Sequence, residues 1–140
     1  MSARFFLDTN IFVYSFAPPA ENKSRRANEL ILAGIKKAEG VISYQVIQEF
    51  FNVALRKFQQ PMNVSEAEQY LATVFRPLAY VPSSPRLFVE GLRLTEKNRL
   101  SWYDALIVAA ALESNCTILY TEDLQDGQRF GELLVKNPFL

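Results

Sequence analysis

The sequence predicts an α/β domain in which a short parallel sheet is covered by helices on both faces. Short apolar segments typical of buried strands alternate along the chain with longer segments of helical periodicity. Acidic residues follow two of the strand-like segments, and sites of open α/β sheets form at these strand ends. Alternation of this kind favours parallel strands joined by helices, and a chain of 140 residues is expected to form one domain, 1–140.

The first half of the chain opens with an apolar segment, FFL, that ends at Asp8. Asn10 is a candidate cap for the helix that follows, which Pro18 and Pro19 would end. Gly40 is a natural stop after the next helix, and Ser43 is a candidate cap for the third. The expected elements are a strand over 4–7, a helix over 11–16, a helix from Asn22 or Ser24 to about residue 37, a strand over 41–43 and a helix over 44–58.

The second half is divided by proline and by helix-capping signals. Ser65 with Glu68, and Ser101 with Asp104, have the spacing of a capping box. The segment after Asp104 is apolar on every side, which predicts a buried helix. The expected elements are a helix from 65 to about 75, a strand over 78–81, a helix from Ser83 or Ser84 to about 98, a helix over 105–112, a strand over 117–120, a loop over 121–128 and a last short strand over 131–135.

The composition limits the possible chemistry. The chain contains no histidine, so acid–base or metal chemistry must rest on carboxylates, whose oxygen atoms favour Mg²⁺ or Mn²⁺. The single cysteine, Cys116, excludes an internal disulfide and fits a reducing, cytoplasmic location. A formal net charge of zero argues against nucleic-acid binding by overall positive charge alone. No apolar segment is long enough for a membrane helix, and an acid at residue 8 is too early for a signal peptide.

Four acids are candidates for one site: Asp8, Glu49, Asp104 and Asp123. Asp8 and Asp123 follow predicted strands, and Asp104 opens the apolar helix. A carboxylate near the start of a helix keeps its charge more easily, which suits a metal ligand. The arrangement predicts metal-assisted phosphodiester chemistry.

Each acid also has a structural interpretation. Asp8 is a possible helix cap, Asp104 is the last residue of a capping box, and the helical pattern places Glu49 on a solvated face, although such a face can line a groove. Asp123 lies in a loop in which Asp and Gly favour turns. The residues alone do not rank Asp123 above Asp126.

Taken together, four segments resemble the PIN-domain family and, within it, VapC-type toxins of toxin–antitoxin pairs. The segments are FFLDTNIFVYSF, ISYQVIQEFFNV, SWYDALIVAAAL and ILYTEDLQDGQ, which occur in the family's order from end to end of the chain. The resemblance implies a three-layer α/β/α fold with a short central parallel sheet. It also implies four acids around one or two divalent cations, with Asp8 and Asp104 as the most direct ligands, and Asn10, Ser43 and Thr121 as accessory polar residues.

The same resemblance implies a metal-dependent endoribonuclease that hydrolyses RNA, forms a homodimer and is silenced by a cognate antitoxin. Mg²⁺ takes only one or two protein carboxylates directly. We therefore expect Asp8 and Asp104 to bind the ion, with Glu49 and Asp123 positioning or deprotonating the attacking water. The fourth acid is the least certain, because Glu122 and Asp126 lie beside Asp123.

Two other classes of phosphotransfer domain also use an aspartate at a strand end. A haloacid-dehalogenase-type domain expects a second aspartate where this chain has Asn10, and a receiver domain expects paired acids near its first strand and a late lysine after a strand. A catalytically inactive PIN-like scaffold that only binds proteins is the remaining alternative. The four acids argue against it, because a pure scaffold has little reason to gather like charges.

Overall fold

The computed structural model describes residues 3–140. Its sheet has six strands in the order β3-β2-β1-β4-β6-β5, and all neighbouring pairs are parallel except β5 with β6. The strands are β1 (Phe5–Leu7), β2 (Gly40–Ser43), β3 (Ala79–Val81), β4 (Ile118–Tyr120), β5 (Arg129–Phe130) and β6 (Leu133–Lys136). The predicted α/β architecture is confirmed.

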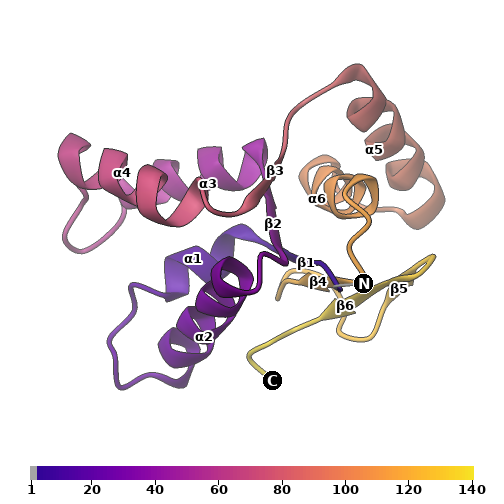
Figure 1. Ribbon diagram of the computed structural model, residues 1–140. Helices are drawn as coiled ribbons and strands as arrows, with labels where there is room; N and C mark the ends of the chain where they lie inside the picture. Colours follow the sequence, from indigo (N-terminus) through magenta and orange to yellow (C-terminus); the bar gives the residue numbers. More distant parts are fainter. Residues whose placement is uncertain (1–2) are drawn as a thin grey trace.

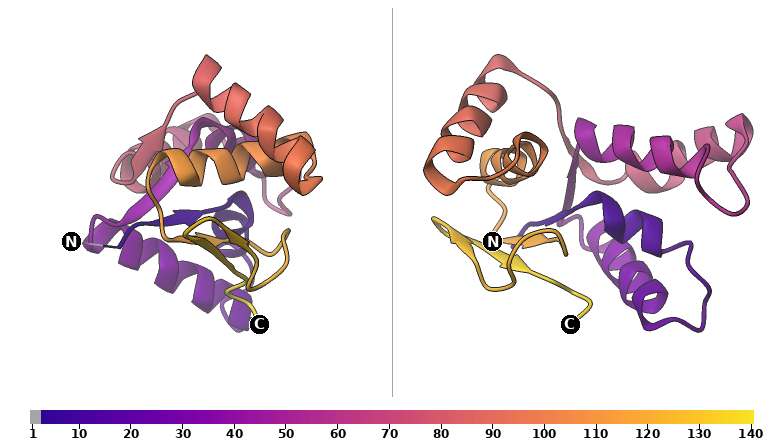
Figure 2. Two further views of the ribbon diagram at one scale, coloured as in Figure 1. Left: turned by 90° about the vertical axis from the view of Figure 1, so that its right-hand side faces the viewer. Right: turned by 180° about the vertical axis from the view of Figure 1, so that it is seen from behind.

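Helices cover both faces of the sheet (Figure 1). Figure 2 shows α6 above the strands and α2 below them, which gives the three layers that the resemblance implied. The helices are α1 (Thr9–Tyr14), α2 (Asn22–Lys36), α3 (Tyr44–Ala54), α4 (Val64–Tyr70) with a π-helical turn η1 (Leu71–Phe75), α5 (Pro85–Asn98) and α6 (Trp102–Glu113).

The core forms because each layer turns an apolar surface toward the sheet. Strand β2 is buried along its whole length, and Ala105–Ala111 of α6 are all buried, as the apolar pattern predicted. Helix α2 approaches β2 closely through Gly34 and Gly40, since a Cβ on Gly40 would lie 2.8 Å from the Cα of Gly34. The close packing fixes the heights of the strand ends relative to one another.

The structure differs from the predicted elements in several respects. Helix α3 ends at Ala54 instead of residue 58, because a turn brings the Phe58 ring against Phe50. The predicted Ser65–Glu68 capping box is wrong: Asn63 and Glu66 form the box two residues earlier, with Asn63 as the cap.

The other differences concern two helix caps and the last strands. Asp8, and not Asn10, caps α1, and Ser43 precedes α3 without a side-chain capping bond. Strand β5 was not predicted, and Gly131 lies in the β5–β6 turn with φ of 63°, a left-handed conformation that glycine adopts readily.

Candidate active site

Three adjacent strands end at one edge of the sheet and place polar residues side by side. Strand β1 pairs in parallel with β2 and β4, with Leu7 opposite Tyr120. Asp8, Ser43 and Thr121 therefore follow at similar heights, and the Asp8 amide donates to the Tyr120 carbonyl at 3.1 Å. All three side chains are buried. This edge is the carboxyl end of the parallel strands, where the sequence predicted the site.

The Asp8 carboxylate is the most deeply buried acid of the site, with 5% of its surface exposed. Its Oδ1 accepts a hydrogen bond from the Thr9 amide at 2.7 Å, and its Oδ2 accepts one from the Thr121 hydroxyl at 2.7 Å. Burial raises the pKa of Asp8 from 3.8 to about 7, against the lowering effect of these two bonds, and the charges of Asp123 and Glu49 raise it further. Asp8 therefore caps α1 and also faces the other acids, so its two interpretations are compatible.

Glu49 reaches Asp8 through one intervening side chain. The Thr9 hydroxyl donates to Glu49 Oε1 at 2.7 Å. Glu49 is half-buried, and Gln45, one turn earlier in α3, is buried. The predicted solvated face is therefore only partly correct for Glu49, because α1 and the start of α6 contact that side of α3. The sequence feature that could have indicated this contact is Thr9, a hydroxyl residue directly beside Asp8.

Asp104 lies half-buried in the first turn of α6. The Ser101 hydroxyl accepts a hydrogen bond from the Asp104 amide at 3.3 Å, which is the backbone half of the predicted capping box. The side-chain amide of Gln45 donates to the Tyr103 carbonyl at 3.1 Å and to Glu49 Oε2 at 3.5 Å. Gln45 thus connects the helix that carries Glu49 to the helix start that carries Asp104.

Asp123 follows β4 and completes the group. The Asp123 amide donates to the Thr121 hydroxyl at 3.1 Å, and the same hydroxyl donates to Asp8. The Asp123 side chain is exposed, yet loss of water contact raises its pKa, and the charges of Asp104, Glu122 and Glu49 raise it further. The charges of Glu49 and Asp123 thus reach Asp8, and those of Glu49 and Asp104 reach Asp123, which places the four acids near one another.

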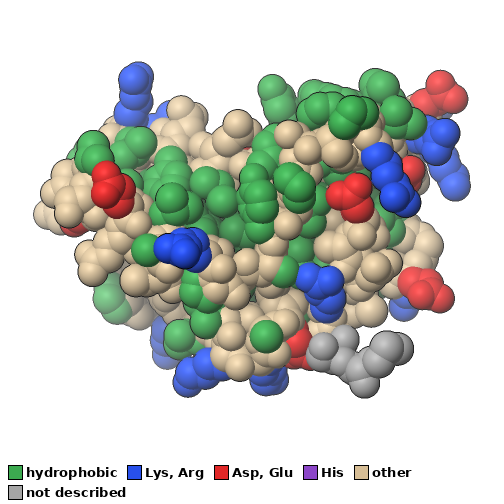
Figure 3. All heavy atoms as spheres, turned by 45° about the horizontal axis from the view of Figure 1, so that its top comes forward, with side chains coloured by type: hydrophobic (Ala, Val, Ile, Leu, Met, Phe, Trp, Pro, Cys, Tyr) green, Lys and Arg blue, Asp and Glu red, His purple; other side chains and the backbone are tan. Residues whose placement is uncertain are grey.

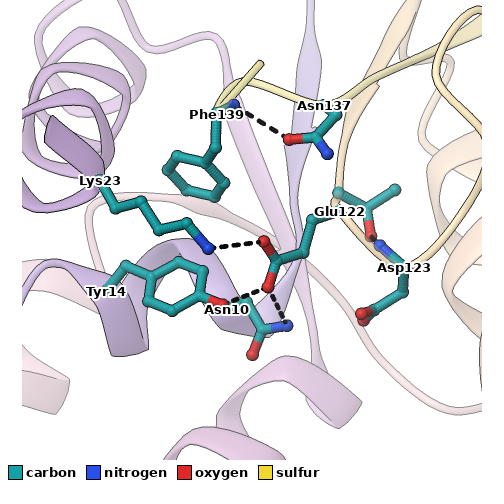
Figure 4. Close-up of polar contacts among 8 residues, drawn as sticks. Asn10, Tyr14, Lys23, Glu122, Asp123, Asn137 and Phe139 are labelled. Atoms are coloured by element: carbon teal, nitrogen blue, oxygen red, sulfur yellow. Dashed lines mark hydrogen bonds and ion pairs between the residues drawn. The ribbon is translucent and has the colours of Figure 1, made fainter.

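The structure separates the other two acids of this loop from Asp123. Asp126 is exposed, and its Oδ1 accepts a hydrogen bond from the Asn137 amide at 2.8 Å. Glu122 turns away from Asp123 toward α1 and α2, as Figure 4 shows. Asn10 donates to Glu122 Oε1 at 3.4 Å, so this predicted accessory residue contacts Glu122.

The residues present fit a hydrated divalent cation. Among residues 3–140 neither of the two ion pairs, Lys23–Glu122 and Arg26–Glu29, involves the four acids, so no side-chain cation neutralises them. Ser43 Oγ and Gln45 Oε1 are buried beside the site and lack a hydrogen-bond partner. A group of oxygen ligands without a cationic partner suits Mg²⁺ or Mn²⁺.

The carboxylates are not drawn into one tight cluster. Within the described range 3–140, no three His, Cys, Asp or Glu side chains lie close enough to hold one ion together as they stand. A cation that keeps most of its waters needs only one or two direct carboxylates. The remaining acids would then act through water.

Comparison with known proteins agrees with the fold. The family model of the PIN domain matches residues 5–128. No curated protein matches the chain. Among solved structures, a toxin–antitoxin complex from Klebsiella pneumoniae has 20% identity and a TM-score of 0.68, with 98% of each chain covered.

Two further solved structures share the fold. VapC20 of Mycobacterium tuberculosis, a toxin that cleaves the sarcin–ricin loop, has 17% identity and a TM-score of 0.61, with 85% of this chain and 89% of that chain covered. VapBC2 from Rickettsia felis, bound to a DNA fragment from its promoter, has 21% identity and a TM-score of 0.64, with 94% and 96% covered. At these identities the likeness shows the fold.

Proposed function

Because this chain belongs to the PIN domain family, we propose that it is a Mg²⁺- or Mn²⁺-dependent endoribonuclease of the VapC type and the toxin of a toxin–antitoxin pair. The observation that carries the proposal is the buried Asp8 carboxylate, which lies near the charges of Asp123 and Glu49 and forms no ion pair among residues 3–140. An ionised carboxylate buried without a counter-charge is costly, and a bound cation would remove that cost.

In this proposal Asp8 and Asp104 hold the ion directly. Both lie at defined positions, one at a strand end and one in the first turn of a buried helix. When bound, the cation would lower the pKa of a water molecule and offset the negative charge of the phosphate. The Thr9 amide and the Thr121 hydroxyl hold the Asp8 oxygens in place, so that little reorganisation is needed on binding.

Glu49 and Asp123 orient the attacking water and accept its proton. Glu49 is held by bonds from Thr9 and Gln45, one to each oxygen. Asp123 lies close enough to Asp104 and Glu49 for their charges to raise its pKa in the metal-free protein, and its exposed side chain is open to water. Water adds to phosphorus as its proton passes to a carboxylate, the bond to the leaving oxygen breaks, and that oxygen takes up a proton.

RNA cleavage by the purified chain tests the proposal. We expect cleavage with Mn²⁺ or Mg²⁺, none in EDTA, and a loss of at least 100-fold in Asp8→Asn and Asp104→Asn, in the range of general acid–base and electrostatic contributions. Glu113→Gln is the matched control, because this exposed acid lies at the other end of α6 from Asp104. Full activity in EDTA, or in both aspartate variants, rules the proposal out.

The partners in the proposal are an RNA substrate, a cognate antitoxin and a second copy of the chain. Solved toxin–antitoxin complexes with the same fold support the antitoxin. Figure 3 shows apolar side chains gathered over one face of the molecule, and large exposed apolar areas mark protein interfaces. Exposed large apolar residues on β3, α5 and α6 include Tyr80, Phe88, Val89, Leu92, Trp102 and Tyr103.

Light scattering of the purified chain tests the second copy. We expect a mass of twice 16.0 kDa, whereas a monomer at all concentrations contradicts the homodimer.

No helix in the described part of the chain is both long and apolar enough to cross a membrane.

The alternative is an inactive PIN-like scaffold that only binds proteins. Calorimetry with Mn²⁺ separates the two functions, because a scaffold has no need of the ion. We expect wild-type binding that is lost in Asp8→Asn.

A further inference from the structure

Glu122 is one of two acids of the strand-end loop that the mechanism does not use, the other being Asp126. Three side chains donate to its carboxylate. The Tyr14 hydroxyl and the Asn10 amide reach Oε1, and the Lys23 ammonium lies 3.3 Å from Oε2. These donors come from α1 and the first turn of α2, whereas Glu122 follows β4 (Figure 4). A single carboxylate thus joins three elements.

A small aromatic cluster surrounds this contact. The Lys23 ammonium lies 4.3 Å from the centre of the Tyr14 ring and 5.5 Å from that of Phe139. The two rings meet edge to face, with centroids 5.1 Å apart. Phe139 is itself held by a bond from its amide to Asn137 Oδ1 at 3.0 Å. The Lys23 side chain stays 45% exposed, so the ion pair is partly solvated, and the two rings add cation–π attraction to it.

The neighbours of Glu122 both belong to the site. Thr121, one residue earlier, donates to Asp8 Oδ2, and Asp123, one residue later, donates its amide to the Thr121 hydroxyl. Thr121 is directed to Asp8, whereas Glu122 points away from Asp123, to Tyr14 and Lys23 (Figure 4). Fixing the middle residue of three limits the backbone freedom of the other two.

We propose that Glu122 is a positioning residue, and that the cluster of Asn10, Tyr14, Lys23 and Phe139 holds it so that Thr121 and Asp123 are preset for the acidic site. The inference rests on the proposed function in its first test, which measures metal binding. The alternative role for Glu122 is that of a further metal ligand. Its direction argues against that role, because the carboxylate points to Tyr14 and Lys23 and away from Asp123 (Figure 4).

Calorimetry with Mn²⁺ is the first test. Residues that orient metal ligands typically change metal affinity by 10–100-fold, so Glu122→Ala is expected to weaken Mn²⁺ binding by roughly tenfold. Glu122→Gln keeps an oxygen acceptor for Tyr14 and Asn10 and is expected to retain most of the affinity. Tyr14→Phe removes one donor without changing charge and is expected to weaken binding in the same direction as Glu122→Ala.

A direct ligand would give a different pattern. Equal losses in Glu122→Gln and Glu122→Ala, with affinity unchanged or raised in Tyr14→Phe, would overturn the positioning role. The matched control is Glu132→Ala, since this exposed acid lies in the β5–β6 turn and makes no side-chain hydrogen bond or ion pair among residues 3–140. It is expected to bind Mn²⁺ as the wild type does.

Amide hydrogen exchange without metal is the second test and does not depend on the proposed function. Glu122→Ala and Phe139→Ala are expected to accelerate exchange at residues 121–124 and to leave the strand amides of β1 protected. Unchanged exchange in both variants would overturn the inference. Failure of the wild type to bind Mn²⁺ would count against the proposed function alone, because the exchange result would still decide the role of Glu122.

Discussion

The position of one carboxylate decides how this site behaves without metal. Asp8 receives two hydrogen bonds, and yet its pKa is raised to about 7, because burial outweighs both of them. The group therefore resists ionisation at the pH at which the site is proposed to work. This cost lowers the stability of the metal-free protein, and in the proposed function the gain is a pre-organised metal ligand.

This balance predicts the effect of Asp8→Asn on stability. The pKa of the folded form, about 7, lies above the unfolded value of 3.8, so ionisation opposes folding. The free-energy cost of ionising Asp8 in the fold is absent below pH 3.8, grows between pH 3.8 and about 7, and is complete at higher pH. In EDTA at pH 8 we expect Asp8→Asn to raise the free energy of unfolding by on the order of 2–4 kcal/mol, measured by urea unfolding.

The same experiment has two internal checks. At pH 4.5 the gain from Asp8→Asn should be much smaller, because the wild-type carboxyl is then largely neutral in the fold. Saturating Mn²⁺ should stabilise the wild type and not the variant, since only the wild type keeps the charged ligand. A variant that is less stable than the wild type at pH 8 would show that the two hydrogen bonds outweigh burial.

The sequence identifies the acids but not their contacts. Asp8 and Asp123 were predicted because strand ends are recognisable from apolar segments, and Asp104 because a polar residue opens an apolar helix. Glu49 was assigned to a solvated face because a helical pattern shows only which residues share a side. Which neighbouring element covers that side depends on tertiary packing, here the approach of α1 through Thr9. The partners of Glu122 are more than ninety positions away for the same reason.

At the scale of elements, the site depends on how closely α2 packs on β2. A Cβ on Gly40 would lie 2.8 Å from Gly34 Cα and 2.8 Å from a methyl group of Leu78. The helix backbone cannot yield as a flexible side chain can. Strand β2 carries Ser43 and leads into the helix of Glu49, so a shift of β2 moves one side of the site.

We therefore expect Gly40→Ala to destabilise the fold by about 1–3 kcal/mol through overpacking. Denaturant unfolding measures the change in stability. Gly34→Ala is the graded comparison, because its nearest contact, at 3.1 Å, is less severe. A Gly40→Ala variant as stable as the wild type would mean that α2 and β2 can separate without cost.

The elements were largely predictable, and the exceptions share a cause. Helix starts at Ser84 and Ser101 follow from capping residues, and both caps are observed. The shift from Ser65 to Asn63 arises because two overlapping segments have the same cap-to-acid spacing, and propensity does not separate them. The two-residue strand β5 was not predicted, because a strand so short shows no periodicity in the sequence and forms only by pairing with β6.

At the scale of the whole molecule, a net charge of zero conceals an uneven distribution. The four acids of the candidate site lie at the carboxyl edge of the sheet. In the proposed function an RNA backbone must approach that edge. Helix α6 runs from this edge to the start of β4. Lys97 in the last turn of α5 and Arg99, which follows that helix, therefore lie near the edge that carries the site. Helix α2 ends with Lys36 and Lys37 at the opposite edge, just before β2 begins. All four side chains are exposed.

This arrangement predicts which basic residues hold the RNA backbone. Reversing Lys97 and Arg99 to glutamate should weaken binding of single-stranded RNA and reduce the slope of log K against log salt by about 0.7 for each phosphate that is no longer neutralised. Lys36→Glu with Lys37→Glu makes the same change in net charge at the far edge and should leave the slope close to that of the wild type. Binding is measured by fluorescence anisotropy in an Asp8→Asn background, which prevents cleavage. Equal slopes for the two double variants would mean that overall charge, and not the edge on which it lies, governs the approach of RNA.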